Sequence, residues 1–528
     1  MKIFIQNYIN ILITFKDKFC RIYIFAIFLI SIIIHLYISS IGWNNFLLDQ
    51  YGFRQTQTAI TTYYVIKEGF KINYITPILG APWSIPFEFP LFQWIVASAV
   101  IIFKTPIDQT GRFISLLFFY LSLIPLGAIL KTYLKNNNFV LIILSLILLN
   151  PIYLFWSRTF MIESLALFFG ILFCWLAIKL FQTNKLRFLI LVSVIGCLAA
   201  LVKITTFIVL CAPTGFFFIY YFWKEKNNMF WNINIIKKYL LYGILIFIIP
   251  LAISIIWNNF SDTQKEMNPL ANGFLTSNDL TKWNFGTIKQ KTSITVWSKI
   301  LKNSLIPYQT FGTTDLFSFA FPNLFLLLIP FLYFFKPYRK EILFLLIFFL
   351  CGPIIFTNLY SVHTYYFYAN NFFLSILLGF FILSLYKNDN FKIKYFGIFI
   401  LFPFILLSLF SQYKEYYYSY QVNNIYSIIQ ATDTIKKITK PNDVILVYGQ
   451  DWNPSFSYYA QRKAIMNRQK LPLNNKIMQE SIQMVGKISA LIVSNINDMK
   501  FINDQIQYLK FNETPIYSDA QTSIFLPK

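Results

Sequence analysis

The stretch IYIFAIFLISIIIHLYISSI, residues 22–41, decides the fold class of this chain. It is almost wholly apolar, and its length matches the ~20 residues with which an α-helix crosses a bilayer. Lys16, Lys18 and Arg21 precede it, and it is too long for a signal-peptide core and lacks a small-x-small cleavage site. We therefore expect an uncleaved first transmembrane helix whose basic N-terminal side faces the cytoplasm.

Similar apolar runs recur as far as Ser411 and dominate the composition of the 528-residue chain. Hydrophobic residues make up 57% of it and charged residues 13%, whereas soluble domains are charged at roughly a quarter of their positions. The formal net charge of +23 falls largely in short loops between apolar runs, where it is a topology signal and indicates no nucleic-acid partner. These features predict an α-helical polytopic membrane protein in contact with membrane lipids.

Two stretches determine how the chain threads the membrane. The apolar stretch 187–223 would form one helix of about 55 Å, far longer than a ~30 Å hydrocarbon core, and both its ends are basic. A break at LVKITT gives two helices and places Lys203 at the outer surface. The segment 89–104 is short and follows several prolines, so we expect a re-entrant or interfacial helix there. The chain then has roughly 11–13 transmembrane helices.

This topology leaves two long loops on the outer side of the membrane. The first covers residues 42–111 and the second residues 257–317. Both connect apolar runs of the region 1–411, which we expect to be a transmembrane catalytic domain because the polar residues of interest lie in or beside these loops.

The tail of the chain, residues 412–528, has a different character. The segments 443–449 and 488–495 have the pattern of buried strands, whereas 424–438 has helical spacing. Alternation of the two types predicts a small C-terminal α/β domain, and the topology places it on the extracytoplasmic side.

Ionisable residues gather on the predicted outer side, at or just inside the ends of apolar runs: Asp49, Arg54, Glu88, Arg158, Glu163, Lys203 and His363. Such groups are costly at membrane depth and by default mark a functional cavity. Each also has a purely structural interpretation: Lys203 reaching the lipid headgroups, Arg158 and Glu163 forming an interfacial ion pair, or Tyr365 and Tyr366 forming an aromatic belt with the histidine. Their joint position on one face favours a single shared site.

The residue types in this set suit the transfer of a sugar from a lipid phosphate. Aspartate and glutamate can take a proton from an acceptor hydroxyl, and arginine and lysine stabilise a departing phosphate. No glycine-rich nucleotide loop is evident in the sequence, which argues against a mechanism driven by a sugar nucleotide or ATP. A transporter or flippase of a lipid-linked sugar is the alternative, although the sequence shows none of the repeated halves that many transporters have.

Five stretches follow one another along the chain: DQYGFRQTQTA (49–59), PFEFPLFQW (86–94), SRTFMIESLALFF (157–169), LVKITTF (201–207) and HTYYFY (363–368). This series resembles the polytopic C-type glycosyltransferase superfamily, in particular its bacterial branch of protein O-mannosyltransferase-like and aminoarabinose-transferase-like enzymes. The tail stretch DWNPSFSYYAQRK (451–463) also resembles the extracytoplasmic domain of bacterial members. The resemblance implies a polyprenyl-phosphate-linked sugar as donor and a lipid, glycan or protein as acceptor. It also implies a location in the bacterial cytoplasmic (inner) membrane.

The resemblance assigns roles to individual residues. The catalytic acid of the family's first outer loop matches Asp49. Many relatives have an Asp-Glu pair there, whereas this chain has Asp49 followed by Gln50, so Glu88 is a second candidate for the catalytic acid. The residues that match phosphate-binding positions are Arg54, Arg158 and Lys203, and the expected pocket residues are Glu163, His363, Tyr365 and Tyr366.

The resemblance leaves the need for a metal open, because some relatives bind a divalent ion near the site and others need none. The sequence has two histidines and five cysteines without recognisable ligand spacing. We therefore assign no metal ligand and no required cofactor, and a divalent metal ion stays an open alternative. The overall expectation is an inverting glycosyltransferase.

Overall fold

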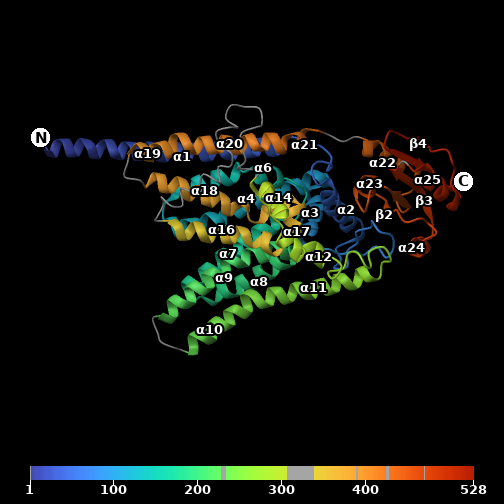
Figure 1. Cartoon of the computed structure of the whole chain (residues 1–528), viewed down its shortest axis with the longest axis horizontal. Helices are drawn as coiled ribbons and strands as arrows, with labels where there is room; N and C mark the ends of the chain where they lie inside the picture. Colours follow the sequence, from blue (N-terminus) through green and yellow to red (C-terminus); the bar gives the residue numbers. More distant parts are fainter. Residues whose placement is uncertain are drawn as a thin grey trace.

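The computed structural model describes residues 2–227, 233–305, 338–387, 391–423 and 427–528, except positions 469 and 497. Part of the predicted second outer loop, 306–317, lies outside these residues. Figure 1 shows a long helical part that begins at the N-terminus, and a group of strands and shorter helices at the opposite end, where the chain terminates. The predicted combination of a helical membrane part and a small C-terminal α/β part is confirmed.

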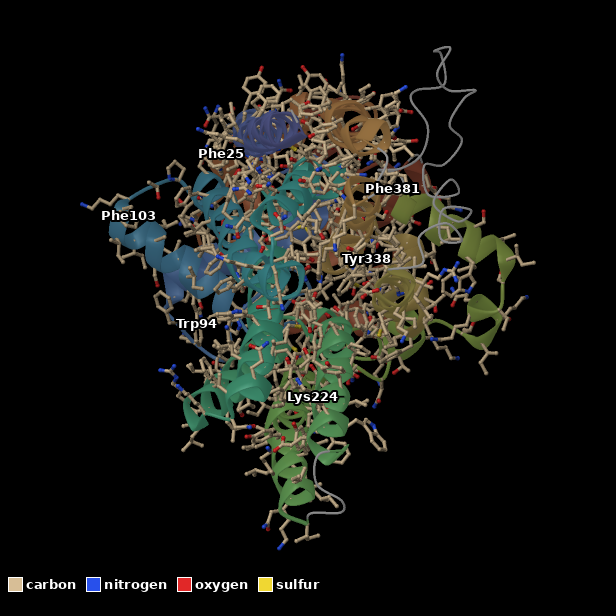
Figure 2. All side chains as sticks on the ribbon, turned by 90° about the vertical axis from the view of Figure 1, so that its left-hand side faces the viewer. Phe25, Trp94, Phe103, Lys224, Tyr338 and Phe381 are labelled. Atoms are coloured by element: carbon tan, nitrogen blue, oxygen red, sulfur yellow. The ribbon has the colours of Figure 1, made fainter. Side chains whose placement is uncertain are left out.

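Six helices in the described part of the chain are long and apolar enough to cross a membrane. They are α1 (Lys2–Ser40), α4 (Ile107–Leu134), α7 (Glu163–Thr183), α9 (Ile204–Asn227), the continuous run of α10 (Ile233–Gly243), η1 (Ile244–Ile248) and α11 (Ile249–Glu266), and the continuous run of α19 (Phe391–Phe396), η5 (Gly397–Leu401) and α20 (Phe402–Tyr416). Large apolar side chains such as Phe25 and Phe103 lie on the outside of this helical part (Figure 2), 51% and 71% exposed. A surface of this kind suits lipid rather than water, and the chain is a multi-pass membrane protein.

Shorter apolar helices pack among the long ones: α3 (Leu91–Phe103), α5 (Asn137–Leu148), α8 (Leu186–Val202), α16 (Arg339–Ile355) and α18 (Asn371–Tyr386). Helix α3 has 13 residues and is about 20 Å long, which is too short to cross a ~30 Å core and agrees with the predicted re-entrant or interfacial helix. Three short elements of six residues each lie near the ends of other helices: α6 (Pro151–Trp156), α17 (Thr357–Val362) and the 3₁₀ helix η4 (Thr364–Ala369).

The long apolar stretch 187–223 is interrupted where the sequence predicts a break. Helix α8 ends at Val202, Lys203 is extended with φ −162°, and α9 begins at Ile204. Both helices pack against α7, which also contacts α4. The break therefore brings Lys203 beside the beginning of α7, where the site described below is found.

Five strands at the C-terminal end form one sheet in the order β2-β1-β3-β5-β4. Strand β1 (Val444–Tyr448) is parallel to β2 (Lys463–Asn467) and β3 (Ile488–Ser494), and the strands predicted at 443–449 and 488–495 are thus confirmed. Strands β4 (Tyr517–Ser518) and β5 (Thr522–Phe525) pair antiparallel. The helices of this part are α22 (Ser427–Ile438), α23 (Ser455–Ala460), α24 (Lys476–Val485) and α25 (Met499–Tyr508).

The predicted first outer loop extends this sheet at its free edge. The N–H groups of Ala464 and Met466 in β2 donate to the carbonyls of Pro77 and Ile78 at 3.0 and 2.8 Å. The N–H of Gly80 donates in turn to the carbonyl of Ala464 at 3.0 Å. Loop and sheet therefore share a hydrogen-bonded ladder, which covers an edge strand and fixes the C-terminal part to the membrane part.

Helices occupy much of both predicted outer loops and cross one predicted boundary. The first loop contains α2 (Gly52–Glu68) and α3, and the described part of the second contains α12 (Thr281–Phe285), α13 (Ile288–Lys291) and α14 (Ile294–Leu305). Helix α11 continues past position 257 to Glu266, and Trp257 and Ser261 on it contact the predicted first outer loop. Helix α20 ends at Tyr416, so the predicted domain boundary at 411 lies inside this helix. The short helix α21 (Tyr418–Val422) comes directly after it.

Candidate active site

Helix α2 borders a hollow of about 340 Å3, its open mouth included. Arg54, Gln57, Thr58 and Thr61 on this helix have the three- and four-residue spacing that places side chains on one face. The loop before α3, α3 itself and the segment leading into α7 complete the lining, which consists of Arg54, Gln57, Thr58, Thr61, Tyr74, Phe87, Glu88, Gln93, Met161, Ile162 and Glu163. Three predicted site residues from distant parts of the sequence therefore border one space.

The first ion pair at the hollow joins Arg54 to Glu88. Arg54 Nη2 lies 3.1 Å from Glu88 Oε1, and Arg54 Nη1 donates to Gln57 Oε1 at 2.5 Å. Both charged side chains are partly exposed, at 22% and 28%. The pair thus has one charge of each sign within reach of a molecule that enters from solvent.

A dense set of hydrogen bonds fixes the loop that carries Glu88. The Tyr74 hydroxyl donates to the Glu88 carbonyl at 2.9 Å and accepts from the Phe87 N–H at 2.6 Å. From α11, the indole N–H of Trp257 donates to the Phe87 carbonyl at 2.9 Å, and the Ser261 hydroxyl donates to a carbonyl one residue earlier at 2.5 Å. Helix α11 therefore holds the backbone of the loop that carries Glu88.

The second ion pair is buried and joins Glu163, the first residue of α7, to Lys203 in the helix break. Lys203 Nζ lies 2.5 Å from Glu163 Oε1, and the two side chains are 5% and 6% exposed. The same ammonium lies 4.5 Å from the ring centre of Tyr366 and 5.2 Å from that of Tyr365, which is cation–π distance. Lys203 therefore points into the protein, and its interpretation as a lysine reaching lipid headgroups is wrong.

His363 belongs to the aromatic wall beside this second ion pair. Its ring stacks on that of Tyr365 with centres 5.2 Å apart and meets Tyr51 edge-on at 5.4 Å and Trp283 at 5.9 Å. Burial lowers the pKa of His363 to about 4, and the positive charges of Arg54 and Lys203 act in the same direction. The imidazole is therefore neutral at physiological pH.

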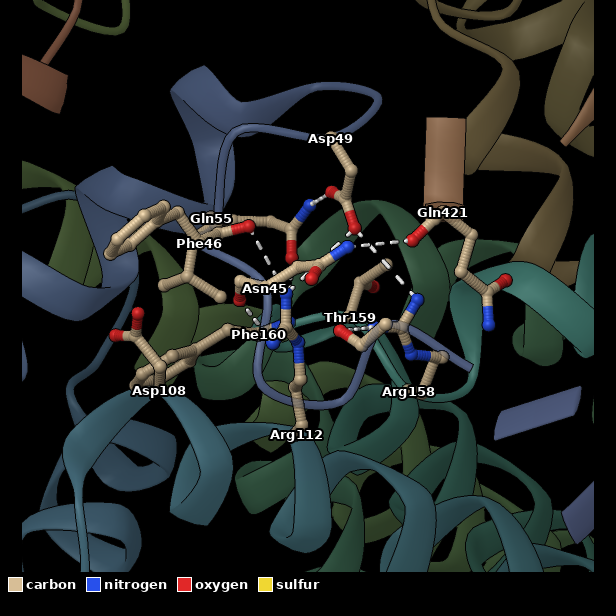
Figure 3. Close-up of polar contacts among 12 residues, drawn as sticks. Asn45, Phe46, Asp49, Gln55, Asp108, Arg112, Arg158, Thr159, Phe160 and Gln421 are labelled. Atoms are coloured by element: carbon tan, nitrogen blue, oxygen red, sulfur yellow. Dashed lines mark hydrogen bonds and ion pairs between the residues drawn. The ribbon is translucent and has the colours of Figure 1, made fainter. Parts of the chain in front are cut away.

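Asp49 lies apart from the hollow, in a buried group of its own (Figure 3). Asp49 Oδ2 is 3.8 Å from Arg158 Nη1 and 3.9 Å from Arg112 Nη2, and the Gln55 amide donates to Oδ1. The carboxylate is 6% exposed and the two arginines hardly at all. Burial raises the pKa of Asp49 above its ordinary value, and the two guanidinium groups counteract this shift.

The fold has solved counterparts, although no family model and no curated protein sequence matches the chain. ArnT from Cupriavidus metallidurans bound to undecaprenyl phosphate superposes with a TM-score of 0.58 at 11% identity, covering 94% of this chain and 97% of that one. Its apo form gives a TM-score of 0.61 at 10% identity over the same shares. The chain has the glycosyltransferase-C fold. An archaeal oligosaccharyltransferase, AglB from Archaeoglobus fulgidus in complex with an inhibitory peptide and a dolichol-phosphate, matches with a TM-score of 0.53 at 11% identity, over 92% of this chain and 70% of its own.

These matches confirm, at the level of the fold, the resemblance carried by the five sequence stretches. ArnT belongs to the aminoarabinose-transferase branch that the sequence resembles. Only about a tenth of the aligned positions are identical between this chain and ArnT. The matches therefore show a shared architecture and assign no residue a role. Residue roles in this glycosyltransferase-C fold therefore depend on the geometry of the chain itself.

Within the glycosyltransferase-C fold, the predicted residues divide into two groups. The hollow and its aromatic wall contain Arg54, Glu88, Glu163, Lys203, His363, Tyr365 and Tyr366. Asp49 and Arg158 form the other group, so the interpretation of Arg158 and Glu163 as an ion pair with each other is wrong. Helix α2 connects the groups, because Arg54 contacts the first and its neighbour Gln55 the second.

Arg112 is the site residue that the sequence interpretation missed. Its Nη1 donates to the carbonyls of Trp43 and Asn45, both at 2.6 Å, and its Nη2 donates to that of Phe46 at 3.3 Å. The loop that leads to Asp49 is therefore wrapped around one guanidinium. A signal existed in the sequence: an arginine near the start of a long apolar helix is rare unless it has a buried partner.

The described residues do not form a recognisable metal-binding site. In the ranges that the structure covers, no three His, Cys, Asp or Glu side chains come together as a metal-binding group. Glu88 and Glu163 each have a cation as ion-pair partner instead. These residues thus do not fit a divalent metal ion.

Proposed function

We propose that the chain is a membrane glycosyltransferase that moves a sugar from a polyprenyl phosphate to an acceptor on the extracytoplasmic side of a bacterial cytoplasmic membrane. The observation that carries this proposal is the placement of two acid–base pairs, Arg54 with Glu88 and Lys203 with Glu163, at one hollow. The comparisons support the proposal, because ArnT is bound to undecaprenyl phosphate and AglB to a dolichol-phosphate in solved structures of this fold.

The cations of the site would stabilise the leaving group. An acceptor oxygen forms a bond to the anomeric carbon of the sugar, while the bond between that carbon and the phosphate oxygen breaks and its electron pair leaves with the phosphate. Arg54 and Lys203 can compensate the negative charge that develops there. Attack from the face opposite the phosphate inverts the anomeric centre.

Arg158 is a third candidate for phosphate binding, proposed from the resemblance. Its Nη2 donates to the Gly42 carbonyl at 3.1 Å, and its Nε and Nη1 have no hydrogen-bond partner among the residues described. Nη1 is ion-paired with Asp49 Oδ2 at 3.8 Å, so a phosphate would bind this buried guanidinium by replacing that carboxylate as its partner.

The proton of the acceptor hydroxyl goes to a carboxylate, and the chain offers two. Asp49 is the acid that the family resemblance implies, and it is held between Arg112 and Arg158. Glu88 is the acid that borders the hollow and meets solvent. We propose that one of these two is the general base and that the other maintains the charge balance of the site.

The test is a transfer assay on purified protein in lipid nanodiscs. A polyprenyl phosphate carrying a radiolabelled sugar is supplied with envelope lipids, glycans and peptides as acceptors, and mass spectrometry follows release of the free polyprenyl phosphate. Label on an acceptor together with released lipid phosphate is the expected result. In matched proteoliposomes, movement of the intact donor across the bilayer without any covalent product would identify a transporter or flippase and overturn the proposal.

A further inference from the structure

Two neighbouring tyrosines of the C-terminal part, Tyr458 and Tyr459 on α23, bind a carboxylate of the helical membrane part. Both hydroxyls donate to Asp108 in the first turn of α4, the Tyr458 hydroxyl to Oδ1 and the Tyr459 hydroxyl to Oδ2 at 3.3 Å. Tyr458 is buried, at 8% exposed. The carboxylate thus fixes where the two phenol rings lie.

The Tyr459 hydroxyl also holds the loop that leads to Asp49. It accepts a hydrogen bond from the Leu47 N–H at 2.5 Å, and its ring meets that of Phe46 edge-on with centres 5.4 Å apart. One oxygen therefore donates to Asp108 and accepts from the loop, as a hydroxyl can. Leu47 is fully buried, so its N–H would be costly without this partner. Asp49 follows only two residues later.

Arg112 holds the same loop by its carbonyl groups. It lies one turn after Asp108 on α4 and donates to the carbonyls of Trp43 and Asn45, both at 2.6 Å (Figure 3). Its Nη2 is also 3.9 Å from Asp49 Oδ2. A guanidinium thus fixes the loop at its acceptors and a phenol fixes it at a donor. Together these contacts determine where the Asp49 carboxylate lies.

The contact between Tyr459 and Leu47 is not what joins the two parts of the chain. The hydrogen-bonded ladder between β2 and the stretch 77–80 does this, and the Ser457 hydroxyl adds a bond to the Pro77 carbonyl at 3.3 Å. Helix α23 also packs against α2. Loss of one phenol hydroxyl therefore leaves the C-terminal part attached and changes the hold on the loop.

We infer that Tyr459 is a positioning residue for sugar transfer: through the Leu47 N–H it fixes the loop that presents Asp49, so the C-terminal part acts on the chemistry of the site. This inference rests on the proposed function. It applies whether Asp49 is the base or the acid that maintains the charge balance, because both roles depend on the position of the carboxylate. A catalytic group displaced by about 1 Å can cost about 10²-fold in rate.

The experiment is a double-mutant cycle on sugar transfer by the full chain in nanodiscs. Tyr459→Phe removes the hydroxyl and is expected to lower kcat by roughly 10–10²-fold with an unchanged KM for the donor lipid. Added to Asp49→Asn, the same change is expected to cost less than about twofold, because the hydroxyl acts through that carboxylate. Tyr517→Phe is the control, since it loses a hydroxyl that donates to Asp519 at 2.8 Å on another strand of the same sheet.

A second measurement reports the loop itself. Hydrogen–deuterium exchange of the peptide 43–49 is expected to be faster in Tyr459→Phe than in wild type and unchanged in Tyr517→Phe. Should Tyr459→Phe fail to fold, Asp108→Asn replaces it, because this change weakens the carboxylate that orients the Tyr459 hydroxyl. Asp108→Asn is expected to lower kcat in the same way and to add little to the loss in Asp49→Asn.

The outcomes separate this inference from the proposed function. An equal fold loss with and without Asp49→Asn, a wild-type kcat in Tyr459→Phe, or a change confined to KM would overturn the positioning role, while the transferase stands. Wild-type turnover in Asp49→Asn together with a loss in Tyr459→Phe would overturn it too, since the hydroxyl would then act by another route. Absence of transfer by the wild-type protein would overturn the proposed function instead.

Discussion

Lys203 Nζ lies 2.5 Å from Glu163 Oε1, although 40 residues separate the two in the sequence. The lysine occupies the break between α8 and α9, and the glutamate opens α7, where the helix dipole favours a negative charge. Because both groups are buried, each is costly without the other. The pair thus anchors the inner end of the hollow to three helices at once.

Removing one member of this pair is expected to destabilise the protein strongly. Lys203→Ala leaves the Glu163 carboxylate buried and uncompensated, at a cost of about 3–5 kcal/mol in the free energy of unfolding. The double change Lys203→Ala with Glu163→Gln is expected to recover much of that loss. Thermal melting of the purified variants in detergent checks this, with Lys238→Ala as control, since its pair with Glu225 is partly exposed. A double variant no more stable than Lys203→Ala would contradict the coupling.

The two candidate bases can be separated by turnover. Changing the true base, either by Asp49→Asn or by Glu88→Gln, is expected to lower kcat for sugar transfer by roughly 10²–10⁴-fold while donor binding persists. The other acid is expected to show a smaller loss. Glu225→Gln is the matched control, because this acid also pairs with a lysine at 2.5 Å but lies outside the hollow. Wild-type turnover in both Asp49→Asn and Glu88→Gln would remove both acids from the mechanism.

The neutral state of His363 predicts a specific pH dependence of stability. Its pKa is lowered to about 4, whereas an unfolded histidine has a pKa near 6.5, so the unfolded chain binds the additional proton as the pH falls between these values. The free energy of unfolding therefore decreases from about pH 6.5 towards pH 4. Melting temperatures between pH 7 and 5 are expected to fall less in His363→Gln than in wild type. An equal fall in both would show that His363 is not the group responsible.

The loop that carries Glu88 depends on one buried asparagine in addition to α11. Asn268 Nδ2 lies 3.2, 3.0 and 3.1 Å from the carbonyls of Leu79, Gly80 and Pro82. Asn268→Leu leaves these carbonyls without their donor and is expected to lower stability by about 1–3 kcal/mol and to reduce kcat/KM as the loop loosens. Asn272→Leu, one turn later and exposed, is the control. If Asn268→Leu is destabilised but keeps full activity, the position of this loop does not affect catalysis and the prediction is wrong.

The proposed orientation can be tested by labelling. In a variant with its native cysteines replaced, a cysteine at Lys476 on α24 is expected to react with a membrane-impermeant maleimide in intact cells. A cysteine at Lys224, exposed near the end of α9 (Figure 2), is expected to react only after permeabilisation. The fraction of protein that shifts on a gel after labelling measures the reaction of each cysteine. Reaction at Lys224 in intact cells would invert the topology and place the hollow elsewhere.

The features that depend on local pattern could be predicted from the amino-acid sequence. The length of apolar runs such as 22–41 is enough to predict spanning helices, because the hydrocarbon core has a fixed thickness. The break at Lys203 follows from the same length argument, and strands β1 and β3 of the tail follow from their short apolar runs. Charged residues beside apolar runs marked the region of the site, since burying a charge without a purpose is costly.

Which of these charges meet becomes apparent in the folded chain and could not be predicted from the sequence. Arg158 is five residues from Glu163 in sequence, yet it contacts Asp49, while Glu163 pairs with Lys203 across a helix interface. Arg112 escaped notice because its partners are mainly backbone carbonyls of a distant loop, and backbone groups have no sequence signature. Ion-pair distances depend on how helices pack and rotate against one another. That packing is set by contacts spread over the whole chain.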